Sequence, residues 1–237
     1  MRFTSPLQRG KLLLRYKRFL ADIELESGET VTAHCTQPGT MMGLTEPGNR
    51  VWVSMSDNPK RKLKFSWELV EVDLGKGPVI VGVNTGLPNR LAAEAIQGGV
   101  IEELTGYPEL RREVRYGGNS RVDILLEGNG IKPCYVEIKN VGLMREHGRA
   151  EFPDAVTARG TKHLGELSAM VREGNRAMLL YVVQREDAER FAVARDIDPE
   201  YGQAFDEARS VGVEALCYAC TLNDREIVVH RRIPIED

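Results

Sequence analysis

Three side chains on two neighbouring strand-like segments have the types and spacing that metal-dependent chemistry requires. Asp123 lies in one apolar segment, and Glu137 and Lys139 lie two residues apart in the next. Side chains two residues apart in a strand share a face, so Glu137 and Lys139 are expected to point the same way. A Gly-Asn-Gly sequence at 128–130 is a strong turn signal. The predicted hairpin therefore brings two carboxylates and a lysine together on a strand surface.

Such a group suits a divalent cation and an activated water. A phosphodiester resists attack by water because its anionic oxygens repel nucleophiles, and a metal together with a cation neutralises that charge. We expect Asp123, Glu137 and Lys139 to be catalytic, with the two carboxylates binding Mg²⁺ or Mn²⁺ and Lys139 activating the water. The alternative is an ordinary cross-strand ion pair with no metal.

The second half of the chain mixes helices and strands. It predicts a helix starting at Pro88, strands near 111–117, 121–127 and 134–140, a charged loop at 145–151, a helix capped by Thr157, a strand at 177–183, a helix at 199–210, and a hairpin of 213–222 with 226–233. This order resembles the restriction-endonuclease-like, PD-(D/E)xK core, in which the Asp and Glu hold magnesium. Val122 stands where that motif often has proline.

The same resemblance implies an acidic metal ligand on the preceding helix. Glu94 is the expected residue, with Glu102 and Glu103 as competitors, and the alternative is a solvated helix carboxylate. On the following helix, Arg159 and Lys162 share one face with His163, because their spacing is i, i+3, i+4. We expect that face to contact phosphate, and the alternative is a solvated charged surface.

The first half of the chain is predicted to be all-β. Turn residues separate five short strands at 11–16, 19–25, 30–35, 50–55 and 64–73. Five strands in this length favour a barrel of the oligonucleotide-binding (OB) type. The predicted fold class is thus α+β, with a barrel domain at 1–83 and a nuclease-like α/β domain at 84–237. The segment 75–78 is interpreted as a connector, and the apolar run 79–83 as further structure.

Basic and aromatic residues alternate at two places in the predicted barrel, which suits backbone contacts and base stacking. The expected nucleic-acid-binding residues are Arg15, Lys17, Arg18, Arg61, Lys62 and Lys64. The alternative is that Phe19, Phe65 and Trp67 are core and the basic residues keep a strand edge soluble. Residues 1–83 carry a net charge of roughly +3 within a chain whose total is −3, an asymmetry typical of a nucleic-acid-facing half.

Composition places the chain in the cytoplasm and away from membranes. No signal peptide and no apolar run of membrane-spanning length is present, and the four cysteines fit reduced thiols. Cys217 and Cys220 form a C-x-x-C motif, but no second one exists and the two positions face opposite sides of a strand. A helix-turn-helix at 208–213 is disfavoured, because a strand-like segment follows Gly212.

The chain resembles the sugar fermentation stimulation protein A family along essentially its full length. The matching segments are Arg15–Phe19, His34-Cys35, Pro38–Met41, Arg61–Lys64, Val83–Thr85, Pro88-Asn89, Arg121–Asp123, Val136–Asn140, Phe152–Thr157 and Arg159–Leu164. The resemblance implies a cytoplasmic bacterial or archaeal protein with an OB-like barrel and a nuclease-like domain. It also implies DNA binding without sequence preference and regulation of sugar (maltose) utilisation genes.

Two hypotheses follow. The first is a non-sequence-specific DNA-binding protein whose divalent-metal site hydrolyses phosphodiesters, with RNA as an alternative substrate. The second is a non-catalytic DNA-binding regulator of sugar (maltose) metabolism genes, in which the acidic cluster is a relic or a structural metal site. A third, a sugar-sensing module, is suggested by the family name alone.

Overall fold

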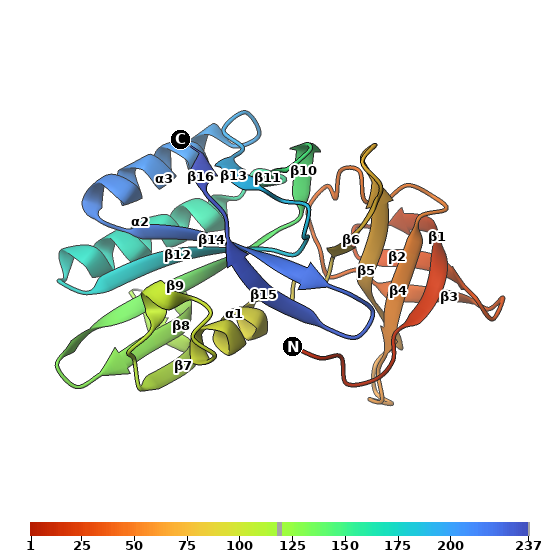
Figure 1. Ribbon diagram of the computed structural model, residues 1–237, viewed down its shortest axis with the longest axis horizontal. Helices are drawn as coiled ribbons and strands as arrows, with labels where there is room; N and C mark the ends of the chain where they lie inside the picture. Colours follow the sequence, from red (N-terminus) through yellow and green to blue (C-terminus); the bar gives the residue numbers. More distant parts are fainter. Residues whose placement is uncertain (118–119, 237) are drawn as a thin grey trace.

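The computed structural model describes residues 1–117 and 120–236, and it has a β-barrel at one end and an α/β part at the other (Figure 1). The barrel is formed by the first strands of the chain, and the α/β part by everything after residue 87. Positions 118, 119 and 237, which belong to the predicted domain at 84–237, lie outside the described residues.

The barrel closes through five strands, as predicted. They are β1 (Gln8–Tyr16), β2 (Leu20–Leu25), β3 (Thr30–His34), β4 (Arg50–Met55) and β5 (Phe65–Asp73). Their order is β3-β2-β1-β4-β5, and a parallel pairing of β3 with β5 closes the ring. Alternate residues of each strand fill the interior, where Trp67 is fully buried. Gly10 lets β1 approach β2, since a Cβ there would lie 2.6 Å from the Glu24 carbonyl oxygen.

A sixth strand joins the barrel to the rest of the molecule. β6 (Pro78–Gly82) pairs with β5, so the run that follows the predicted connector is a strand. The Gly82 N–H donates to the Gln184 carbonyl over 2.8 Å, and Val81 forms a β-bridge with Arg185. Main-chain hydrogen bonds therefore cross directly from the barrel to the α/β part.

The α/β part is built on a six-stranded mixed sheet in the order β15-β14-β12-β9-β8-β7. Its elements are α1 (Pro88–Gln97), the 3-10 helix η1 (Glu102–Leu104), β7 (Glu109–Tyr116), β8 (Ser120–Gly128), β9 (Ile131–Val141), α2 (Ala158–Arg172), β12 (Arg176–Val183), α3 (Pro199–Val211), β14 (Glu214–Leu222) and β15 (Ile227–Arg232). The strands β9, β12 and β14 are parallel, whereas β8 and β9 form the predicted antiparallel hairpin.

A second, four-stranded sheet was not predicted from the sequence. It contains β10 (Leu143–Glu146), β11 (Arg149–Phe152), β13 (Arg190–Val193) and β16 (Ile235–Glu236). The expectation of a charged loop at 145–151 is wrong, because β10 and β11 pair there as a hairpin. Arg145 donates to both carboxylate oxygens of the buried Glu151, at 2.7 and 2.8 Å, so charge neutralisation permits a strand where charge alone suggests a loop.

Helices cover both faces of the six-stranded sheet, with α1 on one face and α2 and α3 on the other (Figure 1). Along β9, Val136 and Ile138 pack with α1, whereas Glu137 and Lys139 face α2. Parallel strands are usually covered on both faces. The expectation that these two polar residues lie on a strand surface is therefore wrong, since Glu137 is 2% and Lys139 9% exposed.

Local signals define the helix ends. The Thr157 hydroxyl accepts a hydrogen bond from the Gly160 N–H at the start of α2, as predicted. Helix α3 ends at Gly212, whose φ of 113° lies in the left-handed region, and β14 follows at once. This arrangement excludes a helix-turn-helix at 208–213.

The cysteines lie on both faces of the six-stranded sheet and in the barrel. Cys217 and Cys220 pack in different hydrophobic clusters on opposite faces of the sheet, and all four cysteines are buried and form no disulfide within the described structure. No helix in residues 1–117 and 120–236 is long and apolar enough to cross a membrane.

Candidate metal and phosphate site

Asp123 is held between the hairpin and the first helix. Its Oδ2 accepts a hydrogen bond from the Ile138 N–H at 2.8 Å, which ties β8 to β9 at the predicted place. Its Oδ1 accepts from Asn89 Nδ2 on α1 at 2.7 Å. The side chain is thus fixed beside the strand that carries Glu137 and Lys139.

Glu137, Lys139 and His163 form a buried cluster beneath α2. Lys139 Nζ donates to Glu137 Oε1 at 2.9 Å, and His163 Nδ1 contacts the same oxygen. Lys139 Nζ also lies 3.4 Å from His163 Nδ1. The structure therefore brings together the three predicted catalytic residues and one of the predicted phosphate-binding residues.

Asp123 and Glu137, the two carboxylates of the candidate site, differ in electrostatic environment. Burial raises the pKa of Asp123 above its ordinary value, and the charge of Glu137 raises it further, against the hydrogen bonds from Ile138 and Asn89. Burial also acts to raise the pKa of Glu137, but the hydrogen bond from His163 and the charge of Lys139 outweigh it and hold that pKa below its ordinary value. Two nearby carboxylates of this kind repel each other.

A divalent cation fits these residues. Glu137 Oε2 is buried and has no hydrogen-bond partner among the described residues, so it has lone pairs for a metal. A cation between Asp123 and Glu137 would also relieve their mutual repulsion, and carboxylate oxygens are the ligands that Mg²⁺, Mn²⁺ and Ca²⁺ prefer. Within 1–117 and 120–236 no three His, Cys, Asp or Glu side chains form a complete metal cluster, so these two provide a partial ligand set.

A pocket of about 400 Å³ opens beside Asp123. Its lining residues come from β7, β8 and α2: Glu113, Ser120, Arg121, Asp123, Arg159, Lys162 and His163. All three predicted phosphate-binding residues of α2 are in that lining, and Arg159 Nε lies 3.3 Å from His163 Nε2. The lining thus combines the cationic side chains of Arg121, Arg159 and Lys162 with the carboxylate of Asp123, which suits an anionic phosphate next to a metal.

Glu94 lies away from this pocket. Its carboxylate is 2.9 Å from the Met1 amino group and 2.9 Å from Arg90 Nε. Glu94 was expected to complete the metal shell, whereas the α1 residue that contacts Asp123 is Asn89, five residues earlier. Helix α1 therefore does contribute a polar side chain to the site, but from the position that faces β8.

The predicted nucleic-acid-binding residues of the barrel have different environments. Arg15 has a structural role, because its Nη2 donates to the carbonyls of Arg18, Gln37 and Gly39 at 2.9, 2.9 and 3.0 Å. Lys17 and Arg18 are exposed at the turn between β1 and β2, where both have positive φ, at 49° and 64°. These two remain available to a ligand.

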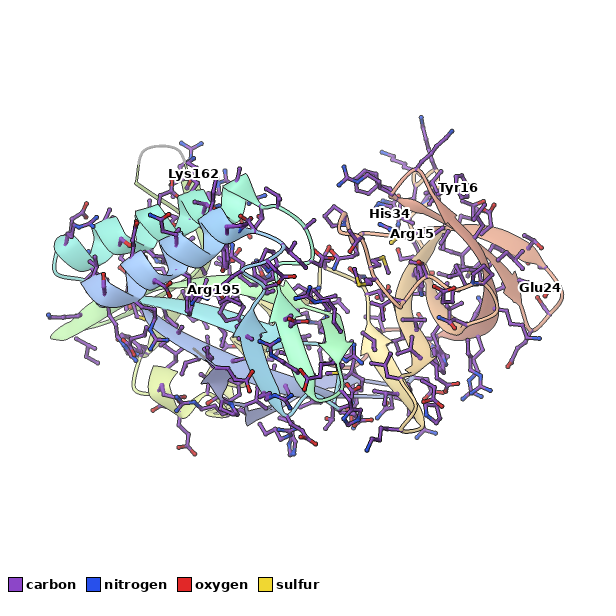
Figure 2. All side chains as sticks on the ribbon, turned by 90° about the horizontal axis from the view of Figure 1, so that it is seen from above. Arg15, Tyr16, Glu24, His34, Lys162 and Arg195 are labelled. Carbon is purple, nitrogen blue, oxygen red and sulfur yellow. The ribbon has the colours of Figure 1, made fainter. Side chains whose placement is uncertain are left out.

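The second basic segment of the barrel follows β4. Lys62 and Lys64 are exposed, whereas Arg61 is half-buried and its Nη2 donates to the Ser66 hydroxyl at 3.0 Å. Among the interleaved aromatic residues Trp67 is core and Phe19 is 46% exposed. In the view of Figure 2, Tyr16 on the barrel and Lys162 on α2 both lie toward the upper edge of the molecule.

Several residues near the site were not predicted from the sequence. Asn89 and Glu113 share a contact, since Asn89 Nδ2 lies 3.4 Å from Glu113 Oε1 as well as 2.7 Å from Asp123. Glu113 has a φ of 54° within β7, an unusual conformation for a strand residue. Arg121 lies two residues before Asp123 on β8, so the two side chains share a face of the strand, and this spacing could have indicated its place in the site.

Two family models match this chain. One is described as the sugar fermentation stimulation protein RE domain and matches residues 86–226. The other is described as the SfsA N-terminal OB domain and matches residues 13–83. Together they confirm the predicted family resemblance and the predicted fold class, an OB barrel followed by a restriction-endonuclease-like α/β domain.

Relatives match over nearly the whole length. The sugar fermentation stimulation protein homolog of Methylobacterium nodulans is 55% identical over 235 residues, which cover 99% of both chains. The homolog of Maricaulis maris is 52% identical over 236 residues, covering 100% of this chain and 99% of that one. The solved structure of Pyrococcus furiosus SfsA in complex with Ca²⁺ superposes with a TM-score of 0.87 at 26% identity, covering 100% of this chain and 98% of that one.

Proposed function

The chain belongs to the sugar fermentation stimulation protein family, and from that premise we propose that it is a non-sequence-specific DNA-binding protein with a metal-dependent phosphodiesterase site. The observation that carries the proposal is the buried Glu137 Oε2, which has no hydrogen-bond partner among the described residues and lies beside Asp123 and Lys139. The solved structure of Pyrococcus furiosus SfsA in complex with Ca²⁺ supports the use of a divalent cation.

Asp123 and Glu137 would hold Mg²⁺ or Mn²⁺. When bound, the metal supplies positive charge at the phosphate and lowers the pKa of a coordinated water. Lys139 is held by Glu137 at 2.9 Å, so its ammonium is positioned to orient the attacking water and to offset negative charge on the phosphate. Arg121, Arg159 and Lys162 line the adjacent pocket and would bind the flanking phosphates.

The barrel would bind the nucleic-acid backbone. Lys17, Arg18, Lys62 and Lys64 are exposed, and contacts from such residues to phosphate carry no sequence information. We therefore assign backbone binding to residues 1–83 and the metal site to residues 84–237. We also propose a cytoplasmic location, where buried cysteines that form no disulfide are usual.

The test compares the wild type with Asp123→Ala on labelled single- and double-stranded DNA and RNA, in Mn²⁺, Mg²⁺ or EDTA. We expect cleavage that requires metal, that is lost in Asp123→Ala, and that leaves gel retardation nearly intact. Asp206→Ala is the matched control, because Asp206 is an exposed aspartate on α3. Cleavage by Asp123→Ala at the wild-type rate would refute the site assignment.

One observation favours a second candidate, a non-catalytic DNA-binding regulator of sugar (maltose) metabolism genes. Both oxygens of Asp123 and Oε1 of Glu137 already have partners within the protein. A cluster satisfied in this way can be structural. This candidate predicts salt-sensitive DNA binding with no cleavage in any divalent metal.

A further inference from the structure

Two loops, one from each part of the molecule, are in direct contact. The barrel loop that follows β3 contacts the segment 153–157, which leads from β11 into α2. The Thr40 hydroxyl donates to the Asp154 main-chain carbonyl at 3.1 Å. Gly39 lies so close to the Asp154 carboxylate that a Cβ at position 39 would clash with it. Asp154 therefore fixes the barrel loop against the start of α2.

Arg15 connects this contact to the exposed turn between β1 and β2. Its Nη2 donates to the carbonyls of Gln37 and Gly39 in the barrel loop, over 2.9 and 3.0 Å. The same nitrogen donates to the carbonyl of Arg18 in the turn, over 2.9 Å. One guanidinium thus holds the turn against the loop that contacts Asp154, while the charged side chains of the turn stay exposed.

On the other side of the contact, the segment 153–157 leads to the phosphate pocket. Thr157 is the N-cap of α2, and Arg159 and Lys162 on that helix line the pocket. In Figure 2, Tyr16 beside the turn and Lys162 on α2 lie toward the same edge of the molecule. A continuous series of contacts therefore runs from the β1–β2 turn, through residues 37–42 and 153–157, to α2. We call this the junction path.

Between its two basic ends the junction path exposes apolar side chains. Phe19 ends the turn, and Met42 and Val156 each lie two residues beyond the contact between Thr40 and Asp154. Phe19 is 46%, Met42 53% and Val156 74% exposed. Single exposed apolar residues are ordinary, but three along one series of contacts form a surface that suits an apolar partner.

The exposure of Val156 has no local structural explanation. An apolar residue just before an N-cap usually packs on the fourth residue of the helix. That residue is Thr161, and the exposed fraction of Val156 shows that no such packing buries it. The flanking main chain is held, because the Thr157 N–H donates to Asp198 Oδ2 at 2.7 Å and the Asp154 carbonyl accepts from Thr40. The segment thus presents an apolar side chain to the solvent.

We propose that the junction path binds an unpaired DNA strand, with the phosphates at its basic ends and the bases on Phe19, Met42 and Val156. The inference rests on the proposed function, because it takes DNA as the ligand. Aromatic and apolar side chains bind the faces of unpaired bases. A duplex hides those faces in its stack and presents phosphates and groove edges. The substrate of the proposed site is therefore single-stranded DNA, or an unpaired segment, that reaches the pocket from the barrel.

The test measures DNA binding by the full-length protein in EDTA, using fluorescence anisotropy, so that cleavage plays no part. The probes are a thymidine oligonucleotide of about 20 nucleotides and a mixed-sequence duplex of the same length. We expect the wild type to bind the single strand about tenfold more tightly than the duplex. Phe19→Ser should weaken single-strand binding about tenfold, and Met42→Ser and Val156→Ser about fivefold each. Val228→Ser and Leu74→Ser are the matched controls and should bind like the wild type, since both residues are exposed and lie outside the junction path.

The salt dependence separates base contacts from charge contacts. None of these substitutions changes a charge, so the slope of log K against log salt should stay that of the wild type while the single-strand affinity falls. A slope that fell in Val156→Ser would show that the change disturbs the phosphate contacts, and it would overturn the assignment of Val156 to a base.

The outcomes distinguish this inference from the proposed function. If Met42→Ser and Val156→Ser bind the oligonucleotide like the wild type, the inference is overturned while DNA binding stands. If they weaken duplex binding as much as single-strand binding, the side chains insert into a duplex, and the preference for an unpaired strand is refuted. If the wild type binds neither probe, the proposed DNA binding is refuted and the inference with it. Should Phe19→Ser not fold, Val156→Ser decides, because that side chain is almost free of packing.

Discussion

Lys139 and Lys17 show how differently the two ends of the molecule hold a cation. The Lys139 ammonium is buried beneath α2 and bound to Glu137, beside His163. Lys17 is exposed at the tip of the β1–β2 turn. A buried cation is part of a network that loses stability when one partner is removed, whereas an exposed one affects mainly what the protein binds. We therefore expect substitutions in the buried cluster to lower the free energy of unfolding, and substitutions at the exposed turn to lower DNA affinity.

The largest effect is expected at Lys139. Lys139→Met leaves Asp123 and Glu137 as neighbouring buried carboxylates without their cation, so we expect the free energy of unfolding to fall by about 3 kcal/mol or more. Urea unfolding in EDTA measures this change, and added Ca²⁺ should recover part of it by replacing the lost charge. Lys17→Met is the control and should change stability by less than about 0.5 kcal/mol. Equal losses in the two variants would contradict the comparison.

Arg15 lies in the barrel, yet its side chain is held by hydrogen bonds within the protein, as that of Lys139 is. Arg15→Ala removes a guanidinium that donates to three carbonyls, and we expect a loss of about 2 kcal/mol. Thermal unfolding measures it, with the exposed Arg18→Ala as the control. If Arg15→Ala unfolded like the wild type but bound DNA poorly, Arg15 would be a DNA contact instead.

The exposed turn should affect DNA affinity alone. Lys17→Asn with Arg18→Gly removes both charges and retains residues that favour positive φ at the two turn positions. We expect DNA affinity at low salt to fall about tenfold and the slope of log K against log salt to fall by about 1 to 2. Fluorescence anisotropy over a salt series measures both. The exposed Lys76→Ala serves as the control, and an unchanged slope would remove this turn from the proposed interface.

The smallest effect is expected at Glu94. Its half-exposed carboxylate forms ion pairs with Arg90 and the Met1 amino group, so Glu94→Gln should cost less than about 1 kcal/mol. Cleavage in Mn²⁺ should stay within about twofold of the wild type, while Asn89→Ala, which frees Asp123 Oδ1, should lower it more. Abolished cleavage in Glu94→Gln would show that this carboxylate reaches the metal after all.

Much of the fold could be predicted from local sequence signals. Alternating apolar residues and intervening turns located all five barrel strands, and Thr157 and Gly212 marked helix ends correctly. The hairpin at 145–151 was missed because Arg145 and Glu151 neutralise each other only once they are paired. In the sequence the two residues are simply two charges, whereas in the fold they form a hydrogen-bonded ion pair.

The candidate site, like the fold, could be predicted from the sequence only in part. Residue types and spacing were enough to predict that Asp123, Glu137 and Lys139 lie together, since a strand period of two and a tight turn leave few other arrangements. How α1 and α2 pack on the sheet followed from contacts between residues far apart in the chain. That packing buried Glu137 and Lys139 and presented Asn89 rather than Glu94 to Asp123.

The physical reason is the range of the interactions. Strand alternation and turn geometry act between residues close in sequence, so they can be inferred from residue types and spacing. The rotation of a helix about its own axis is set by how its apolar stripe packs on strands that are far away in the sequence. A rotation by the angle between two successive residues changes which polar side chain faces the site. For this protein the chain alone specified the pair of strands that carries the carboxylates, and packing specified which helical residues complete the site.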